Sequence, residues 1–343
     1  MRAYEVQRFG IDELTVVERD VAKPKAREVL VRIHAASLNH RDLMVVSGTY
    51  NPRMKLPAVP FSDGAGEVTA VGDDVKQWKV GDRVSPIFAQ GWFEGGPDLQ
   101  KSRTALGAGA QWDGVLREFA VFDQDSLVAI PPHLTYEEAS TLPCAAVTAW
   151  NALVVSGRLK ACETVLTLGT GGVSIFALQF SKMFGAKVIA TSGSDDKLSR
   201  LSALGADEVV NYRSREDWDS AVLELTEKRG VDHVVEVGGA GTLGRSVNAV
   251  RIGGHIALIG ALSGQADFNP ISVFMKAIRL QGIFVGSRSM FEKMNKSIDA
   301  AKLKPVIDKV FEFGEAPEAL RYMAAGAHFG KIVVRVGASG QGS

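Results

Sequence analysis

Two patterns of hydrophobic and polar residues divide the chain. From Leu159 onward, short apolar runs rich in β-branched residues alternate with segments in which apolar residues recur at helical spacing. This alternation is typical of βαβ units, which build a parallel sheet. The predicted strands are Thr164–Leu168, Lys187–Thr191, Glu208–Asn211, Asp232–Val237, His255–Ile259 and Gln281–Val285. The helices expected between them cover about Val173–Phe184, Asp196–Leu204, Asp217–Arg229 and Leu243–Val250. Six such strands form one complete doubly wound α/β sheet.

The first 130 residues follow a different pattern. Short predicted strands are separated by turns rich in Gly, Pro and Asp, and no alternation of strand and helix develops. These strands are Val29–His34, Glu67–Val71, Arg83–Ile87 and Arg117–Val121, and one more strand covers Gly330–Val336. We therefore expect a mostly β domain with few helices. The glycine-rich stretch Gln90–Gly114 is predicted to be a long loop without regular structure.

Composition narrows the class of protein. The chain has 343 residues, and 39 Lys plus Arg balance 39 Asp plus Glu. This balance, without a clustered basic run, argues against a nucleic-acid partner. No uninterrupted apolar stretch approaches the roughly 18 residues of a membrane span, so we expect no membrane association. A chain of this length usually divides into two domains.

The cysteines indicate a reducing compartment. Cys144 and Cys162 are the only two, which is too few for a disulfide framework. The N-terminus shows no apolar signal segment before its first charged residue. We therefore expect a cytoplasmic protein.

A glycine-rich turn follows the first strand of the α/β region. Thr164–Leu168 runs into Gly169, Thr170, Gly171, Gly172, Val173 and Ser174, and then into a predicted helix. Gly169 permits the tight turn, Gly171 allows the backbone to approach a pyrophosphate, and the helix N-terminus offers free N–H groups. Because the turn lies between a strand and a helix, we predict dinucleotide contacts from Gly169, Gly171, Gly172 and Val173. The alternative is a glycine-rich turn without a ligand.

The end of the second strand indicates which dinucleotide binds. A site for NADH places an acidic residue there, whereas the 2′-phosphate of NADPH needs small donors and a cation. The strand ends in hydroxyl residues, and the next acidic residues, Asp195 and Asp196, suit the first turn of a helix better. We therefore predict NADPH rather than NADH. The expected contacts are Ser192, Ser194, Lys197 and Tyr212, and the alternative is that Lys197 and Arg200 form a solvated helix face.

Several segments together resemble the medium-chain dehydrogenase/reductase superfamily. They are Asp63–Val68 with Val71 and Gly72, Gly81–Val84, the helix around Thr148 and the predicted dinucleotide fold, and the resemblance runs from Tyr4 to Val336. It implies a GroES-like catalytic domain at residues 1–145 and 306–343, and a Rossmann domain at residues 146–305. It also implies an active-site cleft between them.

The resemblance also bears on metal. Zinc-dependent members hold a catalytic zinc with a Cys, a His and a second Cys, and by local pattern these positions fall on Asn39, Ser62 and Cys144. Only Cys144 is retained, and a catalytic zinc needs three protein ligands. His40 and Asp63 form an alternative set with Cys144, but their spacing matches no ligand motif. We therefore expect no zinc.

The chain thus resembles the zinc-free, quinone oxidoreductase-like branch, in which an Asn replaces the first ligand. Without a metal, a substrate carbonyl is polarised by hydrogen-bond donors alone, which favours conjugated acceptors that spread negative charge. The candidate donors are Asn39, Thr148 and Tyr50. The resemblance implies that Thr148 contacts the nicotinamide. The alternatives are a buried helical hydroxyl for Thr148 and packing on Pro52 for Tyr50.

Further cofactor contacts are implied where the last two strands end. The resemblance places Gly260, Val285, Ser287 and Arg288 there. For Arg288, an ion pair with Glu292 one helical turn away is the alternative.

Three functional hypotheses remain open at this point. The first is an NADPH-linked reductase of enones, quinones or related carbonyl compounds without zinc. The second is a nicotinamide-dependent alcohol dehydrogenase, and the third is a dinucleotide-binding protein without turnover. A homodimer is expected, because the apolar strand Gln281–Val285 would otherwise be an exposed sheet edge.

Overall fold

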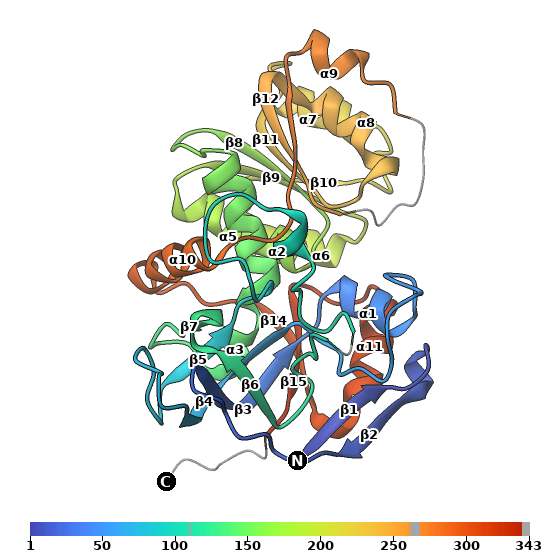
Figure 1. Cartoon of the computed structure of the whole chain (residues 1–343). Coiled ribbons are helices and arrows are strands. Elements are labelled where there is room, and N and C mark those ends of the chain that lie inside the picture. The colour runs from blue at the N-terminus through green and yellow to red at the C-terminus, as the bar shows by residue number, and fades with distance from the viewer. Residues whose placement is uncertain (110, 261–267, 338–343) are drawn as a thin grey trace. The chain divides into compact units, whose positions relative to one another are not determined.

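The computed structural model describes residues 1–109, 111–260 and 268–337. The chain divides into two compact units, one of Met1–Val147 with Gly286–Ser343 and the other of Thr148–Val285 (Figure 1). The second boundary, expected after residue 305, therefore falls after Val285. The reason is that the segment after Val285 packs within the first unit, where the backbone N–H of Arg288 donates to the Trp92 carbonyl at 3.0 Å.

The second unit contains the predicted doubly wound α/β fold. Its six-stranded parallel sheet has the order β10-β9-β8-β11-β12-β13. The strands are β8 (Thr164–Leu168), β9 (Lys187–Ser192), β10 (Glu208–Asn211), β11 (Val231–Glu236), β12 (Val250–Leu258) and β13 (Arg279–Gly282). The helices are α4 (Val147–Trp150), α5 (Gly172–Met183), α6 (Asp195–Ala203), α7 (Trp218–Leu225), α8 (Ala240–Ala249) and α9 (Ile271–Met275). The order reverses beside β8, and ligands of such sheets bind where it reverses.

The last strand of this sheet differs from the prediction. The expected strand was Gln281–Val285, whereas β13 pairs Arg279–Gly282 with His255–Leu258 of β12. Val285 adopts a positive φ of 41°, which an extended strand does not allow. An apolar run alone does not distinguish a strand from the connection that follows it.

The first unit is built around a seven-stranded sheet. Its order is β14-β15-β3-β4-β5-β7, with β6 also paired to β3, and β1 and β2 form a separate hairpin. The strands are β1 (Arg2–Val6), β2 (Leu14–Glu18), β3 (Glu28–Ser37), β4 (Asp63–Val71), β5 (Arg83–Pro86), β6 (Phe119–Asp123), β7 (Leu127–Ala129), β14 (Ile307–Glu312) and β15 (Lys331–Arg335). The helices are α1 (His40–Val46), α2 (Leu99–Ser102), α3 (Tyr136–Ser140), α10 (Arg288–Ala301) and α11 (Ala316–Ala324). On β3, Val29, Val31 and Ile33 are fully buried, so alternate side chains form the core of this unit.

Two π-helical segments, Leu142–Ala146 and Asn151–Ser156, flank α4. Short 3₁₀ turns occur at Ile11–Glu13, Gln124–Ser126 and Phe313–Glu315.

The stretch Gln90–Gly114 is more ordered than the predicted loop. It contains α2, and Trp92 is only 1% exposed. The Trp92 indole N–H donates to the Gly95 carbonyl at 3.0 Å, and the Phe93 carbonyl accepts from the Ser289 N–H at 3.0 Å. Trp92 therefore anchors this stretch to the start of α10; Ala110 lies outside the described residues.

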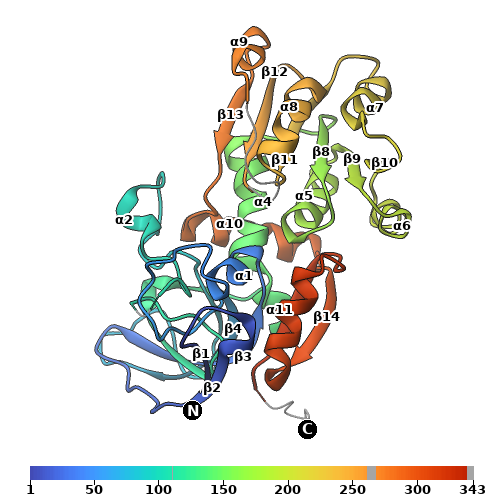
Figure 2. The ribbon, with the colours of Figure 1, turned by 90° about the vertical axis from the view of Figure 1, so that its right-hand side faces the viewer.

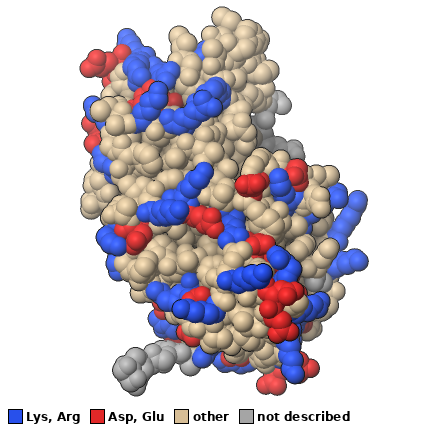
Figure 3. Space-filling model, turned by 60° about the vertical axis from the view of Figure 1, so that its left-hand side comes forward, with Lys and Arg blue, Asp and Glu red and all other residues tan. Residues whose placement is uncertain are grey.

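Charges of both signs are mixed on one face of the molecule. On the face shown in Figure 3, basic and acidic side chains are interspersed without a large region of one sign, which agrees with the net charge of zero. Within the part of the chain that the structure describes, no helix has the length and apolar character needed to cross a membrane.

Candidate active site

Three neighbouring strands of the first unit bring together residues far apart in the sequence. β15 pairs with β3, and β3 pairs with β4, so that Ser37 lies opposite both Val333 and Asp63. Lys331 begins β15, Asp63 begins β4, and Asn39 lies two residues after the end of β3. The sheet register therefore gathers an ammonium, a carboxylate and an amide at one end of the sheet.

Lys331 donates two hydrogen bonds within this cluster. Its side chain is buried, and its Nζ donates to the Leu38 carbonyl at 2.6 Å and to Asn39 Oδ1 at 2.7 Å. Burial lowers the pKa of Lys331, and the nearby Asp63, Cys144 and Asp42 oppose this shift. The sequence analysis did not identify Lys331. A Lys in an otherwise apolar strand, Ile332–Val334, was the available signal.

Asp63 is a fully buried carboxylate held by two donors. Its Oδ1 accepts from the Ser62 hydroxyl at 2.7 Å, and its Oδ2 accepts from the Cys144 backbone N–H at 3.0 Å. Burial raises the pKa of Asp63, while Lys331, the Ser62 hydroxyl, the Asn39 side chain and the Cys144 N–H lower it. Burial, followed by the charge of Asp63, raises the pKa of the Cys144 thiol far above its ordinary value. Cys144 is therefore a neutral thiol.

The positions that hold zinc in related enzymes do not fit a metal in this chain. Asn39 Oδ1 accepts from an ammonium, Ser62 donates to a carboxylate, and the thiol of Cys144 is protonated. His40 and Asp63 do not complete a set of three zinc ligands with Cys144. The Asp63 carboxylate instead accepts hydrogen bonds from the Ser62 hydroxyl and the Cys144 N–H. Across residues 1–109, 111–260 and 268–337, no group of three or more His, Cys, Asp or Glu is arranged to hold a metal ion.

Asn39 opens helix α1, and Asp42 fixes its backbone. The Asn39 N–H donates to Asp42 Oδ2 at 2.8 Å, and the Asp42 N–H donates back to the Asn39 carbonyl at 2.9 Å. Asp42 is fully buried, and burial raises its pKa to about 6. Among the described residues, Asn39 Nδ2 has no hydrogen-bond partner of normal geometry. Nδ2 carries two N–H groups: one lies toward the Asp63 carboxylate, whose pKa the Asn39 side chain helps to lower, and the other is left for a ligand oxygen.

Tyr50 lies against a guanidinium group. The guanidinium of Arg41 lies over the Tyr50 ring at 4.8 Å and over the Phe88 ring at 4.9 Å. Arg41 and Asp42 are mostly or fully removed from solvent, with side chains 11% and 0% exposed. Tyr50 itself is 40% exposed, which leaves its ring accessible.

Thr148 lies on α4, at the start of the second unit, and is 3% exposed. Its burial agrees with either role considered for it, a nicotinamide contact or a buried helical hydroxyl.

The glycine-rich turn after β8 has the geometry of a phosphate-binding loop. Gly169 has a positive φ of 71°, and Gly171 caps α5, whose first residues are Gly172 and Val173. A Cβ added at Gly169 or Gly171 would meet no atom within 4 Å, so open space lies beside both residues. Ser174 is buried, and its hydroxyl donates to the Leu168 carbonyl at 2.6 Å, which ties the helix to the strand. The residues present therefore fit a dinucleotide pyrophosphate.

The end of β9 presents hydroxyls and a nearby cation. Ser192 is 3% exposed, and Ser194 caps α6, where its hydroxyl accepts from the Lys197 N–H at 3.5 Å. Asp195 is engaged elsewhere, because its carboxylate accepts from the Asn211 side chain at 2.6 Å.

Tyr212 and Arg213 lie over Gly193. A Cβ there would approach the Tyr212 ring at 2.8 Å and Arg213 Nε at 2.9 Å. The sequence analysis identified Tyr212 but not Arg213. A basic residue directly after the strand-ending Tyr was the available signal.

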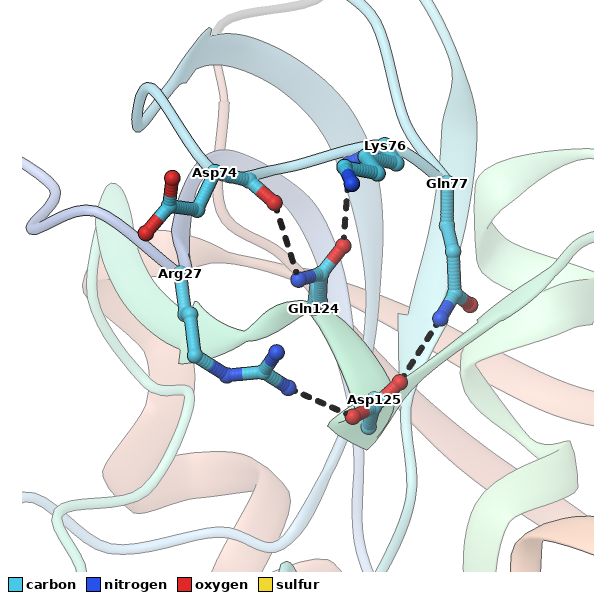
Figure 4. A pocket seen from close by; sticks show the side chains of 6 residues that line it. All are labelled: Arg27, Asp74, Lys76, Gln77, Gln124 and Asp125. Carbon is cyan, nitrogen blue, oxygen red and sulfur yellow. Dashed lines mark hydrogen bonds and ion pairs between the residues drawn. The ribbon is translucent and has the colours of Figure 1, made fainter.

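Arg288 contacts protein side chains in this structure. Its Nε pairs with Glu292 at 2.9 Å, and its Nη2 and Nη1 reach Gln77 at 2.9 Å and Asp125 at 3.4 Å. Gln77 and Asp125 also line a surface pocket of about 370 Å³ with Arg27, Asp74, Lys76 and Gln124 (Figure 4). The polar groups of this pocket bond to one another, as between Arg27 and Asp125 at 2.7 Å. A cofactor contact from Arg288 stays a prediction.

The other residues expected near the nicotinamide lie at turns. The Val285 carbonyl accepts from the Asn151 side chain at 2.8 Å, and Ser287 caps α10. At Gly260, a Cβ would lie 2.0 Å from the Val237 carbonyl oxygen, so only glycine fits. A buried residue that the sequence analysis missed orders this region: Glu236 accepts from the N–H groups of Gly238 and Gly239 at 2.8 and 3.0 Å.

The two units together define a nicotinamide-dependent oxidoreductase of two domains. Residues 25–132 match the model of the alcohol dehydrogenase GroES-like domain, and residues 172–300 match that of the zinc-binding dehydrogenase. The chain belongs to the medium-chain dehydrogenase/reductase superfamily. The region matched by the second model does not contain residues 39, 62 and 144, so the match carries no information about zinc.

Individual relatives agree with this membership. The chain is 42% identical over 335 residues to a zinc-type alcohol dehydrogenase-like protein of Schizosaccharomyces pombe (strain 972 / ATCC 24843), covering 95% of this chain and 96% of that protein. It is 30% identical over 328 residues to quinone oxidoreductase of Sus scrofa, covering 93% and 92%. A solved structure of the 2-octenoyl-CoA carboxylase reductase CinF, in complex with NADP and 2-octenoyl-CoA, superimposes with a TM-score of 0.85 at 26% identity, covering 97% of this chain and 84% of that chain.

Proposed function

We propose that this NAD(P)-dependent oxidoreductase uses NADPH to reduce a conjugated carbonyl compound, an enone or a quinone, without catalytic zinc. The observation that carries the proposal is the hydrogen-bonded Lys331, Asn39 and Asp63 cluster at the place where related enzymes hold the metal. A quinone and a conjugated thioester occur in the names of similar proteins, which supports this substrate class.

In this proposal the chain's own residues donate hydrogen bonds and deliver a proton. When bound, NADPH supplies the hydride. Addition to the β-carbon of an enone places negative charge on an enolate oxygen, which neutral donors stabilise more easily than an isolated alkoxide. We assign Asn39 Nδ2 and the Thr148 hydroxyl to this oxygen, and the Tyr50 phenol to proton delivery. A proton taken up from Tyr50 or solvent completes the two-electron reduction.

NADPH rather than NADH is the proposed cofactor. The end of β9 offers the hydroxyls of Ser192 and Ser194, and Asp195 is bonded to Asn211 instead of facing a ribose. Arg213 joins Lys197 as a cation for the 2′-phosphate, and the ring of Tyr212 flanks the adenosine. A 2′-phosphate favours such an arrangement, whereas a 2′-hydroxyl favours a carboxylate.

We further propose a homodimer and a cytoplasmic location. Among the described residues, β13 pairs with β12 alone at the border of its sheet, and α9 lies beside it (Figure 2). Ile252, Phe274 and Met275 are about two-thirds exposed there, at 71%, 67% and 69%, which suits a second copy of the chain. Cys144 and Cys162 are free thiols, as expected in a reducing compartment.

The direct test is a panel of acceptors assayed by NADPH oxidation. We expect turnover of enones and quinones, with little or none of saturated aldehydes and ketones. Asn39→Ala and Thr148→Ala should each lower kcat about 100-fold, the usual effect of losing one preorganised donor. Preferred turnover of simple alcohols or aldehydes would support the alcohol dehydrogenase alternative. NADPH binding without turnover of any acceptor would support the third hypothesis, a dinucleotide-binding protein without turnover.

A further inference from the structure

Lys331 is a buried cation that contacts one candidate donor directly. It is 3% exposed, and its two hydrogen bonds go to the carbonyl of Leu38 and to the side chain of Asn39. A buried ammonium is costly, and an apolar residue at the start of a central strand would pack more easily. This cost suggests that the contact serves a purpose beyond stability.

The contact determines how the Asn39 amide is turned. An ammonium has only donors, so it must face the amide oxygen and not the amide nitrogen. The 2.7 Å contact to Oδ1 therefore points Nδ2 away from Lys331. Nδ2 carries two N–H groups: this orientation turns one toward the Asp63 carboxylate, whose pKa the Asn39 side chain helps to lower, and leaves the other for a substrate oxygen.

The backbone of Asn39 is fixed independently. Its N–H is held by the buried carboxylate of Asp42 at 2.8 Å, so backbone and side chain are each restrained by a buried charged group. Donors restrained in this way stabilise developing charge without having to reorganise during the reaction.

The cation also has an electrostatic effect on the amide. Asp63, at the start of β4, accepts from Ser62 and Cys144. Lys331 acts on both groups, because its charge lowers the pKa of Asp63 and its Nζ donates to the amide oxygen of Asn39. A hydrogen bond accepted by an amide oxygen polarises the amide and makes its N–H groups better donors.

We propose that Lys331 is a positioning residue that orients and polarises the Asn39 amide, so that Nδ2 donates to the oxygen of the reacting substrate. The proposal rests on the proposed function, in which Asn39 faces the substrate. Lys331 would then supply, through an amide, part of the positive potential that related enzymes obtain from a metal.

A double-mutant cycle tests whether Lys331 acts through Asn39. We expect Lys331→Met to lower kcat at least 10-fold with little change in the KM for NADPH. In the Asn39→Ala background the same substitution should change kcat by less than twofold. Lys309→Met, at an exposed position on β14, is the matched control and should leave kcat unchanged. An equal loss of kcat in both backgrounds, or no loss in either, would overturn the proposal.

A second variant keeps the test open if Lys331→Met does not fold. Asn39→Asp retains an oxygen for Lys331 and removes the Nδ2 donor. We expect protein that still folds, because Lys331 keeps an oxygen partner, together with a kcat about 100-fold lower. Wild-type turnover by Asn39→Asp would show that Nδ2 is not the donor and would overturn the proposal.

A spectroscopic measurement separates this proposal from the proposed function. The chain has seven asparagines, so protein labelled with [¹⁵N]asparagine gives a simple set of side-chain amide signals. The pair that disappears in Asn39→Ala should shift more than any other pair in Lys331→Met, and an unshifted pair would overturn the contact. Wild-type protein that turns over no enone or quinone would contradict the proposed function, while this spectrum would still decide whether Lys331 holds Asn39.

Discussion

At the scale of single residues, short-range patterns predicted what lies close along the chain and missed what the sheet brings together. The glycine turn at 169–173 was predictable, because a pyrophosphate site needs adjacent residues between one strand and one helix. Lys331 was not, since it meets Asn39 only through the pairing of β15 with β3, across 292 positions of sequence. Arg213 was missed because its side chain lies near Gly193, which follows the neighbouring strand β9.

Arg213 provides a prediction about cofactor choice. Arg213→Ala should raise the KM for NADPH about 10-fold or more and leave the KM for NADH nearly unchanged, because only NADPH carries the added phosphate. Lys197→Ala should act in the same direction. Arg215→Ala is the matched control, since that guanidinium is already paired with Asp217 and Glu224. An unchanged ratio of the two KM values in Arg213→Ala would remove this residue from the phosphate site.

His255 provides a prediction about acid stability. Burial, with His233 and Arg279 nearby, lowers its pKa to about 3, and its Nε2 lies 3.0 Å from the Ser156 hydroxyl. His233 is in turn paired with Glu163 and lies close to Asp232.

Below pH 6.5, His255 therefore binds a proton in the unfolded chain but stays neutral in the folded protein. The free energy of unfolding should fall as pH drops, by at most about 2 kcal/mol between pH 7 and pH 5. Urea unfolding of His255→Gln should show a weaker pH dependence than wild type. Identical pH dependence in His255→Gln and wild type would contradict this explanation.

At the scale of elements, periodicity predicted the strands of the α/β unit well and their connections less well. β8 and β10 have the predicted bounds, whereas β13 begins and ends earlier than the apolar run suggested. The many glycines of Gln90–Gly114 predicted a stretch without regular structure. The sequence did not show that one residue, Trp92, is buried and anchors it. Hydrophobic spacing describes how a segment faces a core, and not where the chain turns.

The edge of the α/β sheet carries a prediction about assembly. If β13 and α9 pair with a second copy, then Phe274→Glu should place a charge in an apolar interface and shift the dimer to monomer in light scattering at micromolar concentration. Leu99→Glu, at a residue of the first unit that is 67% exposed, should leave the mass unchanged. A monomeric wild-type protein would contradict the proposed dimer.

At the scale of the whole molecule, the two-domain oxidoreductase fold was predictable and the division between its units was only partly so. Alternating strands and helices indicate a doubly wound sheet wherever they occur, and superfamily membership agrees with that fold. The helix α10 continues the α/β sequence pattern, yet it packs with the first unit, because its first residues bind the Trp92 and Phe93 carbonyls. Contacts of this kind depend on tertiary structure, so the periodicity of the sequence does not predict them.

The central claim is that the hydrogen-bonded cluster of Lys331 and Asn39, and not a metal, stabilises the negative charge on the substrate oxygen. The most direct measurement is the rate of NADPH-dependent enone reduction as a function of zinc bound per chain, determined by elemental analysis of the same samples. We predict full activity in protein with less than about one-tenth of a zinc per chain, and no gain when zinc is added. Activity that rises in proportion to bound zinc would contradict this account.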